Sequence, residues 1–191
     1  YKERKQKGLE TSKCAYFLSF LVAKKSLKVL EYNRLIKDLK SHTKETFLSA
    51  LKNIGTVTPL NEIQKPIKEH QFTVCFEGEY FSFELFAHLI DKKNSVNSID
   101  SAILSDFILA PILGIVDLKN SDNIEFSPGN IPLKDIEEKL ASRKCTLAFL
   151  LFPLTIEQVN KVADEGLNMP PKSTWLEPKL RSGLTIYSIN E

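Results

Sequence analysis

The distribution of apolar residues along the chain predicts a series of short strands separated by helices. From Ala15 to Ala23 the residues are almost continuously apolar, which is typical of a strand that is buried on both faces. After a polar turn at 24–26, a second apolar segment from Leu27 to Ile36 predicts another strand. Further strands are predicted at residues 72–76, 80–86, 124–126, 146–152 and 184–189.

The clearest local prediction is an antiparallel hairpin in the middle of the chain. Phe72, Val74 and Phe76 alternate with other residues, and Glu77-Gly78 follows them as a turn signal. An aromatic-rich segment at 80–86 then has the pattern of the returning strand.

Helix-start residues precede several segments whose apolar residues recur at helical spacing. Thr43 can cap one helix, Ser98 another, and Thr155 with Gln158 has the spacing of a capping box. Helices are predicted at residues 43–54, 99–110, 132–140 and 155–166, and residues 1–7 could finish a helix that began upstream, with Gly8 as its stop. Residues 56–71 contain two prolines and are predicted to form a short helix or an irregular connection.

The irregular alternation of strands and helices predicts an α+β fold, in which helices pack on a mixed, largely antiparallel sheet. A length of 191 residues fits one domain over 1–191, with a possible division into 1–90 and 91–191. Hydrophobic residues make up 42% of the chain, which is enough for a packed core.

Charge and cysteine content narrow the classes of partner. The net charge is only +2, and the aromatic hairpin has no Lys or Arg between Gln71 and Ile90, so both features argue against nucleic-acid binding. Cys14, Cys75 and Cys145 are far apart and odd in number, as expected of buried thiols in a reducing cytoplasm rather than of a metal site. We find no secretory signal pattern and no apolar run of the ~20 residues that a membrane span requires.

The segment 169–183 is the strongest candidate for a functional site. Its prolines stiffen the chain, and it carries Lys172, Ser173 and Thr174, followed by Lys179 and Arg181. Cations, hydroxyls and free backbone N–H groups on a stiff loop can bind an anion. The alternative is a structural loop that covers a sheet edge, with Trp175 filling the core. The glycine-rich part of a Walker loop is missing.

Outside this segment, Arg34 has a functional and a structural interpretation, whereas the histidines and Asp100 are interpreted as structural or surface residues. Arg34 could bind a phosphate or carboxylate in bidentate fashion, or form a structural ion pair. His42, His70 and His88 have no ligand spacing and are predicted to be surface or capping residues. Asp100 is predicted to be a favourable charge in the first turn of its helix. No residue can be assigned as catalytic from the sequence, and no metal site is predicted.

Several segments together resemble a bacterial and archaeal family, known as domain of unknown function 1015. They are residues 30–34, 109–115, 162–166, 169–175, 177–180 and 182–184, and the likeness extends over essentially the whole chain. The family often has a histidine immediately before the arginine of its Tyr-x-Arg segment, whereas this chain has Asn33.

The resemblance implies that this chain is the C-terminal half of a longer protein. Family members are about twice as long, and their N-terminal half ends in an Asp-Gly-His-His-Arg motif followed by a tyrosine that Tyr1 resembles. That motif is similar to those of the ParB-like superfamily, which includes nucleotide-using partition proteins and free-serine kinases. This chain would then pack against its own absent N-terminal half.

Three functions follow as hypotheses. The first is binding of a phosphorylated small molecule or nucleotide within a larger phosphoryl-handling enzyme, with ATP or ADP and magnesium as candidate cofactors of the full-length protein. The second is a ParB-like, DNA-associated regulatory protein, and the third is a non-catalytic interaction or folding module. The ligand, the reaction and the oligomeric state are left open by the sequence.

Overall fold

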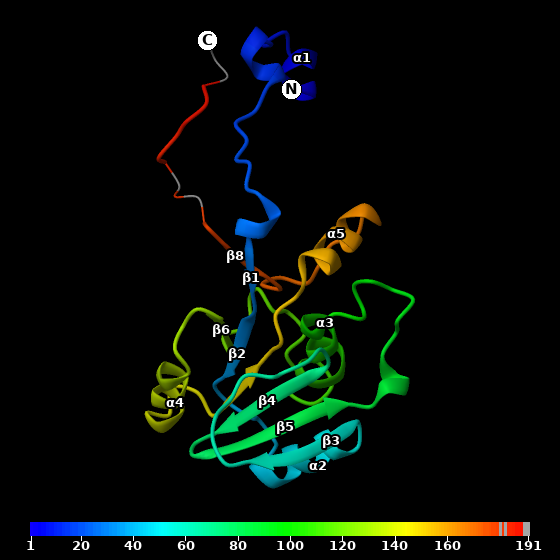
Figure 1. The fold of residues 1–191 in the computed structure, drawn as a ribbon, viewed down its shortest axis with the longest axis vertical. Helices are drawn as coiled ribbons and strands as arrows, with labels where there is room; N and C mark the ends of the chain where they lie inside the picture. The colour runs from blue at the N-terminus through cyan, green and yellow to red at the C-terminus, as the bar shows by residue number, and fades with distance from the viewer. Residues whose placement is uncertain (180, 182, 189–191) are drawn as a thin grey trace. The chain divides into compact units, whose positions relative to one another are not determined.

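The computed structural model describes residues 1–179, 181 and 183–188, which form two compact units (Figure 1). The larger unit spans residues 29–175, and the smaller unit combines residues 1–28 with the described part of 176–191. A separate two-stranded sheet is formed by β1 (Lys28–Leu30) and β8 (Trp175–Glu177). The prediction of one domain, with a possible division near residue 90, stays a prediction.

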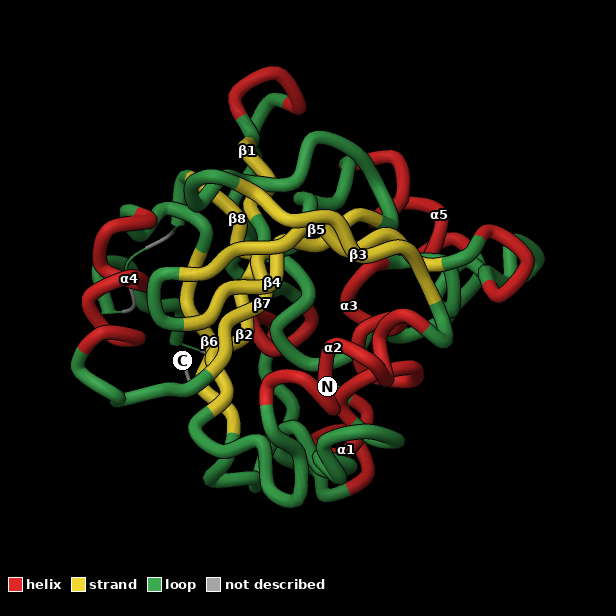
Figure 2. The backbone as a smooth tube through the Cα atoms, turned by 90° about the horizontal axis from the view of Figure 1, so that it is seen from below, coloured by secondary structure: helices red, strands yellow, loops and turns green. Residues whose placement is uncertain are grey.

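The larger unit is built on a six-stranded sheet (Figure 2). Every neighbouring pair of its strands is antiparallel. In spatial order its strands are β3 (Gly55–Leu60), β5 (Glu79–Leu85), β4 (Gln71–Phe76), β7 (Leu147–Leu150), β2 (Tyr32–Ile36) and β6 (Ile124–Pro128). The predicted α+β fold is therefore confirmed.

The register of the central strands decides which residues share one end of the sheet. Arg34 in β2 and Val74 in β4 both pair with Phe149 of β7, so these three residues lie in one row across the sheet. Because β2 and β4 are each antiparallel to β7, they run in the same direction. Their first residues therefore lie at the same end of the sheet.

Helices cover both faces of this sheet (Figure 2). The larger core lies under α2 (Lys44–Lys52) and α3 (Asp100–Leu104), which continues as a π-helical turn at Ser105–Leu109. A smaller core on the opposite face lies under α4 (Leu133–Ala141). Val159 of α5 (Ile156–Asp164) packs on a third cluster of buried residues, formed by Ile99, Ala102 and Leu154.

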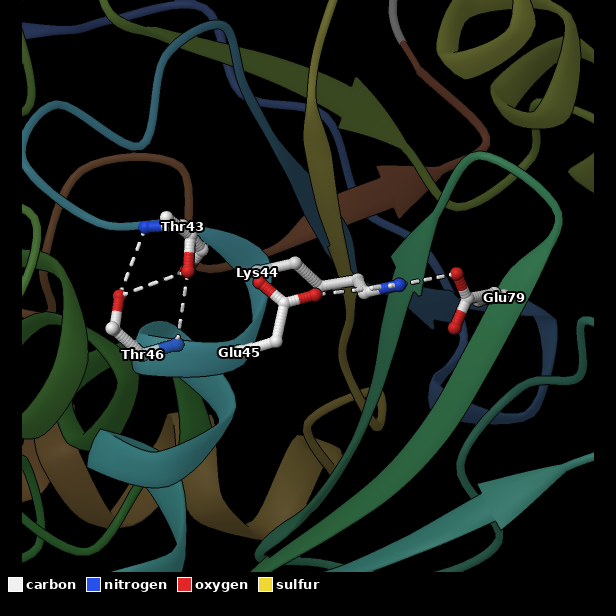
Figure 3. Close-up of polar contacts among 5 residues, drawn as sticks. All are labelled: Thr43, Lys44, Glu45, Thr46 and Glu79. Atoms are coloured by element: carbon white, nitrogen blue, oxygen red, sulfur yellow. Dashed lines mark hydrogen bonds and ion pairs between the residues drawn. The ribbon is translucent and has the colours of Figure 1, made fainter.

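Local capping explains where two of the helices begin. The hydroxyl of Thr43 accepts the Thr46 N–H, and Thr46 accepts the Thr43 N–H in return (Figure 3). Thr155 and Gln158 form the same arrangement at α5, as their spacing predicted. Reciprocal bonds of this kind satisfy two backbone N–H groups that a helix otherwise leaves free.

Two predictions for the larger unit were wrong in detail. Residues 55–60 form the edge strand β3, where a helix or irregular connection was expected. The edge position tolerates Pro59, because a residue without an N–H can face away from the single neighbouring strand. Ser98 does not cap the helix after it: Ile99 occupies the cap position, and the Ser98 hydroxyl donates to the Ser95 carbonyl instead.

The smaller unit contains the short helix α1 (Lys2–Gln6) and 3₁₀ turns at Ser12–Ala15 and Lys24–Ser26. Gly8 follows α1 with φ +65°, as expected of the glycine that ends a helix.

All three cysteines of the chain are free and buried. Among the helices that the structure describes, none is long and apolar enough to cross a membrane.

The predicted buried strand at 15–23 was wrong. Several of its side chains are at least half exposed, with fractions of 70% for Tyr16, 83% for Phe17, 50% for Leu18, 53% for Phe20 and 90% for Leu21. A strand buried on both faces needs neighbouring strands and a covering layer on each side. No strand of the described chain pairs with this segment.

The predicted last strand at 184–189 was also wrong in the part that the structure describes. Residues 184–188 form turns and irregular structure, and the side chains of Leu184 and Ile186 are exposed. Ile189 lies outside the described residues. An alternating pattern needs a neighbouring strand to become a sheet, and no described strand pairs with these residues.

Candidate functional site

The structure brings Arg34 and Lys172 together although they are 138 residues apart in the sequence. The guanidinium Nη2 of Arg34 donates to the carbonyl of Lys172 at 3.0 Å, and Nη1 donates to the carbonyl of Tyr32 at 2.7 Å. Arg34 itself is fully buried in the central strand β2. The turn at 170–174 is therefore anchored to the sheet by this guanidinium.

Arg34 carries a buried charge that no carboxylate balances within the described residues. Its guanidinium lies 4.6 Å from the centre of the Phe126 ring, and its Nε has no hydrogen-bond partner among the residues that the structure describes. Burial lowers the pKa of Arg34 to about 9, with Tyr32 acting weakly in the opposite direction. Arg34 thus remains mostly protonated at neutral pH and supplies positive charge under the turn.

Lys172 places a second cation at the same point. Its backbone is left-handed, with φ +56°, and its ammonium lies 5.4 Å from the centre of the Tyr32 ring. Among the described residues it has no ion-pair partner. Tyr32 also meets Trp175 edge to face, with ring centroids 5.8 Å apart. Tyr32 therefore contacts both ends of the Lys172–Trp175 segment.

Ser173 is a structural residue in this turn. Its hydroxyl donates to the carbonyl of Pro170 at 2.6 Å, so the 2.8 Å contact with Ser101 is one in which Ser101 donates. Ser173 is 9% exposed, and Thr174 beside it is half-buried. The turn is thus closed by one internal bond and joined to α3 by another.

Lys179 and Arg181, the remaining residues of the predicted anion site, belong to the smaller unit. The candidate site is therefore described from the four predicted residues that lie in the larger unit, which are Arg34, Lys172, Ser173 and Thr174.

A histidine–aspartate pair that the sequence did not reveal lies at the beginning of α3. Oδ1 of Asp100 accepts from the backbone N–H of His70 at 2.9 Å and lies 3.0 Å from the ring Nδ1 of His70. Asp100 is 5% exposed, so it is a buried carboxylate as well as the predicted charge in the first helical turn. The two residues are 30 positions apart, and no spacing motif connects them.

The surroundings raise the pKa of both His70 and Asp100. The hydrogen bond to Asp100 raises the pKa of His70 above its ordinary value. Burial raises the pKa of Asp100, and the hydrogen bonds from His70 oppose that effect. Ser101, the neighbour of Asp100, contacts Ser173, so the first turn of α3 touches both His70 and the 170–174 turn.

Another buried polar residue lies immediately before the strand that carries Arg34. Glu31 is 3% exposed, and its carboxylate accepts from Lys65 Nζ at 2.8 Å. A side chain at Gly129 would place its Cβ 2.4 Å from the Glu31 Cδ, so the Glu31 carboxylate would have to move to make room for it. Asn33, where the family often has histidine, accepts the Leu151 N–H at 3.2 Å through Oδ1 and leaves its Nδ2 without a partner.

A cavity of about 300 Å³ lies elsewhere in the larger unit, beside the β4–β5 turn. It is lined by Lys44, Phe76, Glu77, Glu79, Leu140, Arg143, Cys145 and Thr146. Lys44 points across to Glu79 and forms an ion pair with it (Figure 3). Burial raises the pKa of Cys145 to about 11, so its thiol is not a nucleophile at neutral pH. None of the predicted site residues lines this cavity.

Comparison with known proteins identifies the family. A model of the family described as protein of unknown function (DUF1015) matches residues 1–102, more than half of the chain. This chain belongs to the DUF1015 family. A search of curated proteins gives no match.

Comparison with solved structures gives several matches at low sequence identity. A free serine kinase in complex with AMP is 18% identical, with a TM-score of 0.46, over 79% of this chain and 54% of that chain. A mutant of free serine kinase in complex with ADP is 18% identical, with a TM-score of 0.45 and the same coverage. A conserved hypothetical protein from Pyrococcus furiosus is 16% identical, with a TM-score of 0.46, over 79% and 56%. This DUF1015 chain spans about half the length of these structures.

Proposed function

We propose that this chain is part of a larger cytoplasmic protein that binds a phosphorylated small molecule or a nucleotide. Arg34 and the turn at 170–174 would form the wall that faces the anionic group of the ligand. The observation that carries this proposal is the fully buried Arg34, which has no described carboxylate partner and is hydrogen-bonded to the carbonyl of Lys172.

A buried cation without a counter-ion favours the approach of an anion. Removing a charge from water costs free energy, and a nearby opposite charge returns part of it. At an effective dielectric constant of about 20, opposite unit charges ~6 Å apart attract each other by about 3 kcal/mol. An anion held by the Lys172 ammonium would gain from the charge of Arg34 without direct contact.

The contacts of the turn indicate which groups can reach a ligand. The hydroxyl hydrogen of Ser173 is used by Pro170, so Ser173 shapes the turn and does not donate to the ligand. The Lys172 ammonium, which lies over the Tyr32 ring, is the principal group that remains. Lys179 and Arg181 belong to the smaller unit, and their part in anion binding stays a prediction.

ATP or ADP is the cofactor that we propose for the longer protein. Phosphoryl transfer depends mainly on positioning and on stabilising negative charge, which a cationic wall supplies. In the described part of the chain, no three His, Cys, Asp or Glu side chains cluster so that they could hold a metal. The magnesium of this proposal is the ion that commonly accompanies nucleotide phosphates.

Calorimetric titration with inorganic phosphate, AMP, ADP and phosphoserine tests this proposal. The variant Lys172→Asn removes the charge with a residue that tolerates left-handed backbone. We expect its dissociation constants to rise about tenfold, which corresponds to ~1.4 kcal/mol. The control Lys161→Gln changes an exposed lysine of α5 and should leave binding unchanged. Equal affinity in the wild type and Lys172→Asn, or no binding of any probe, would contradict the proposal.

We further propose that the smaller unit packs against the N-terminal half of the longer protein through the exposed apolar run, defined as residues 16–22. Both faces of this run are apolar, and the backbone groups of residues 17–22 form no hydrogen bond with described residues. An unpaired, apolar extended segment is the kind of edge that adds to a neighbouring sheet.

A further inference from the structure

His70 and the Lys172 turn lie at the same end of the sheet. His70 immediately precedes β4, and Tyr32, over which Lys172 lies, is the first residue of β2. These two strands run in the same direction with only β7 between them. At a strand spacing of about 4.8 Å, the two positions are roughly 10 Å apart across the sheet. His70 also lies two residues, or about 7 Å, beyond the row that Tyr32 shares with Phe72.

The His70–Asp100 pair and the Lys172 turn also lie on the same face of the sheet. Ile36 of β2 and Val74 of β4 contribute to the larger core, and residues two apart along a strand share a face. Tyr32 and Arg34 are therefore on the face of the larger core, and so is Phe72 at the start of β4. On this face the contact between Ser101 and Ser173 connects the two groups, because Ser101 follows Asp100 in α3.

The pairing with Asp100 determines which nitrogen of His70 is available. Asp100 accepts at Nδ1, so Nε2 is the ring nitrogen without a partner among the described residues. The side chain of His70 is 22% exposed, while that of Asp100 is 6% exposed. A buried carboxylate thus orients a partly accessible imidazole, in the manner of second-sphere partners that fix a histidine tautomer.

We propose that His70, oriented by Asp100, is the second contact point of the ligand site, and that the ligand is a molecule as long as a mononucleotide. Its phosphate would lie at the Lys172 turn, and a hydrogen-bond acceptor at its other end would receive the Nε2–H of protonated His70. This inference rests on the proposed function and narrows its ligand class, since inorganic phosphate and phosphoserine are too short to reach both points.

The charged groups around His70 set the direction of the pH dependence. Asp100 and Glu69 raise the pKa of His70, whereas Lys92 and partial burial lower it, and the net shift is upward. The Nε2–H that donates to the ligand is present below this raised pKa and is lost as the pH rises through it. Binding through His70 is therefore strongest at slightly acidic pH.

The ratio of the affinities for AMP and inorganic phosphate tests the inference with the full chain. Inorganic phosphate reaches only the Lys172 turn. The effect of phosphate titration on the ratio is the same for the wild type and for His70→Asn, so the difference between the two proteins reports on His70. We expect AMP to be preferred roughly fivefold or more at pH 6, and less at pH 8, as expected for a charge-assisted hydrogen bond. The variant His70→Asn, which tolerates the left-handed φ of +63° at this position, should lower the AMP preference about fivefold at pH 6 and by less at pH 8.

Asp100→Asn provides the second variant. It keeps an oxygen acceptor for His70 but removes the charge, so the pKa of His70 measured by NMR should fall and the AMP preference should move to lower pH. One outcome separates the two proposals: the binding of both AMP and phosphate depends on Lys172, but the ratio of their affinities is unchanged in His70→Asn. That outcome would overturn the role of His70 and leave the proposed function intact. Failure of both probes to bind would remove the proposed function and this inference together.

Discussion

Arg34 connects the centre of the sheet with a turn 138 residues later in the chain. Arginine suits this position because its planar guanidinium donates to two carbonyls at once while it stacks on Phe126. A lysine has a single donor group and no planar surface. The identity of the residue, and not only its charge, therefore determines how the turn is held.

The substitution Arg34→Lys tests this role. We expect the free energy of unfolding to fall by about 1–3 kcal/mol, because at least one carbonyl would be left buried without a donor. Urea unfolding followed by circular dichroism measures the change. The surface substitution Lys161→Arg serves as the control and should not move the midpoint. An unchanged midpoint in Arg34→Lys would show that the two hydrogen bonds contribute little.

At the scale of elements, most helices and strands follow from patterns that are confined to a short stretch of sequence. The alternation at 72–76 and the Glu77-Gly78 turn produced the hairpin of β4 and β5, in which Phe72 lies opposite Phe83. The apolar spacing of 133–140 produced α4 with Ile136 and Leu140 buried. Elements of this kind depend on turn chemistry and periodicity, which the sequence displays directly.

The capping box of α2 gives a prediction at this scale. Thr43→Ala removes the hydroxyl that accepts the Thr46 N–H (Figure 3), and we expect it to lower the free energy of unfolding by about 1 kcal/mol. Thermal and urea unfolding measure the effect. Thr43→Ser keeps the hydroxyl and should restore most of the stability. A loss as large in Thr43→Ser would mean that the methyl group, rather than the cap, is responsible.

For the whole molecule, the exposed apolar run at 16–22 is the feature that the described fold does not accommodate. Its composition predicted a buried strand, but no described strand pairs with it. Exposed apolar residues in such a continuous segment usually mark a surface that another polypeptide covers. This agrees with the proposal that the chain functions as part of a longer protein.

Cysteine labelling tests that proposal. Leu21→Cys places a thiol at a position that is 90% exposed in this chain, and Ile67→Cys places the control at a position that is 79% exposed in the larger unit. The three native cysteines are buried and should react slowly. In the longer protein we expect labelling at 21 to slow at least tenfold, a factor equivalent to ~1.4 kcal/mol of protection, while labelling at 67 is unchanged. Equal rates at 21 in both proteins would contradict the packing.

The sequence by itself determined the α+β class, the hairpin, α2, α4, α5 and the stiffness of the Pro170-Pro171 turn. Each depends on interactions within a few residues, which periodicity, caps and turn residues encode. Only the tertiary structure decided that Arg34 holds the Lys172 turn, that His70 pairs with Asp100, and that no strand of the described residues pairs with 15–23. These outcomes depend on which distant segments come into contact. A local pattern shows that a segment is apolar or charged, but it does not show which other segment will contact it.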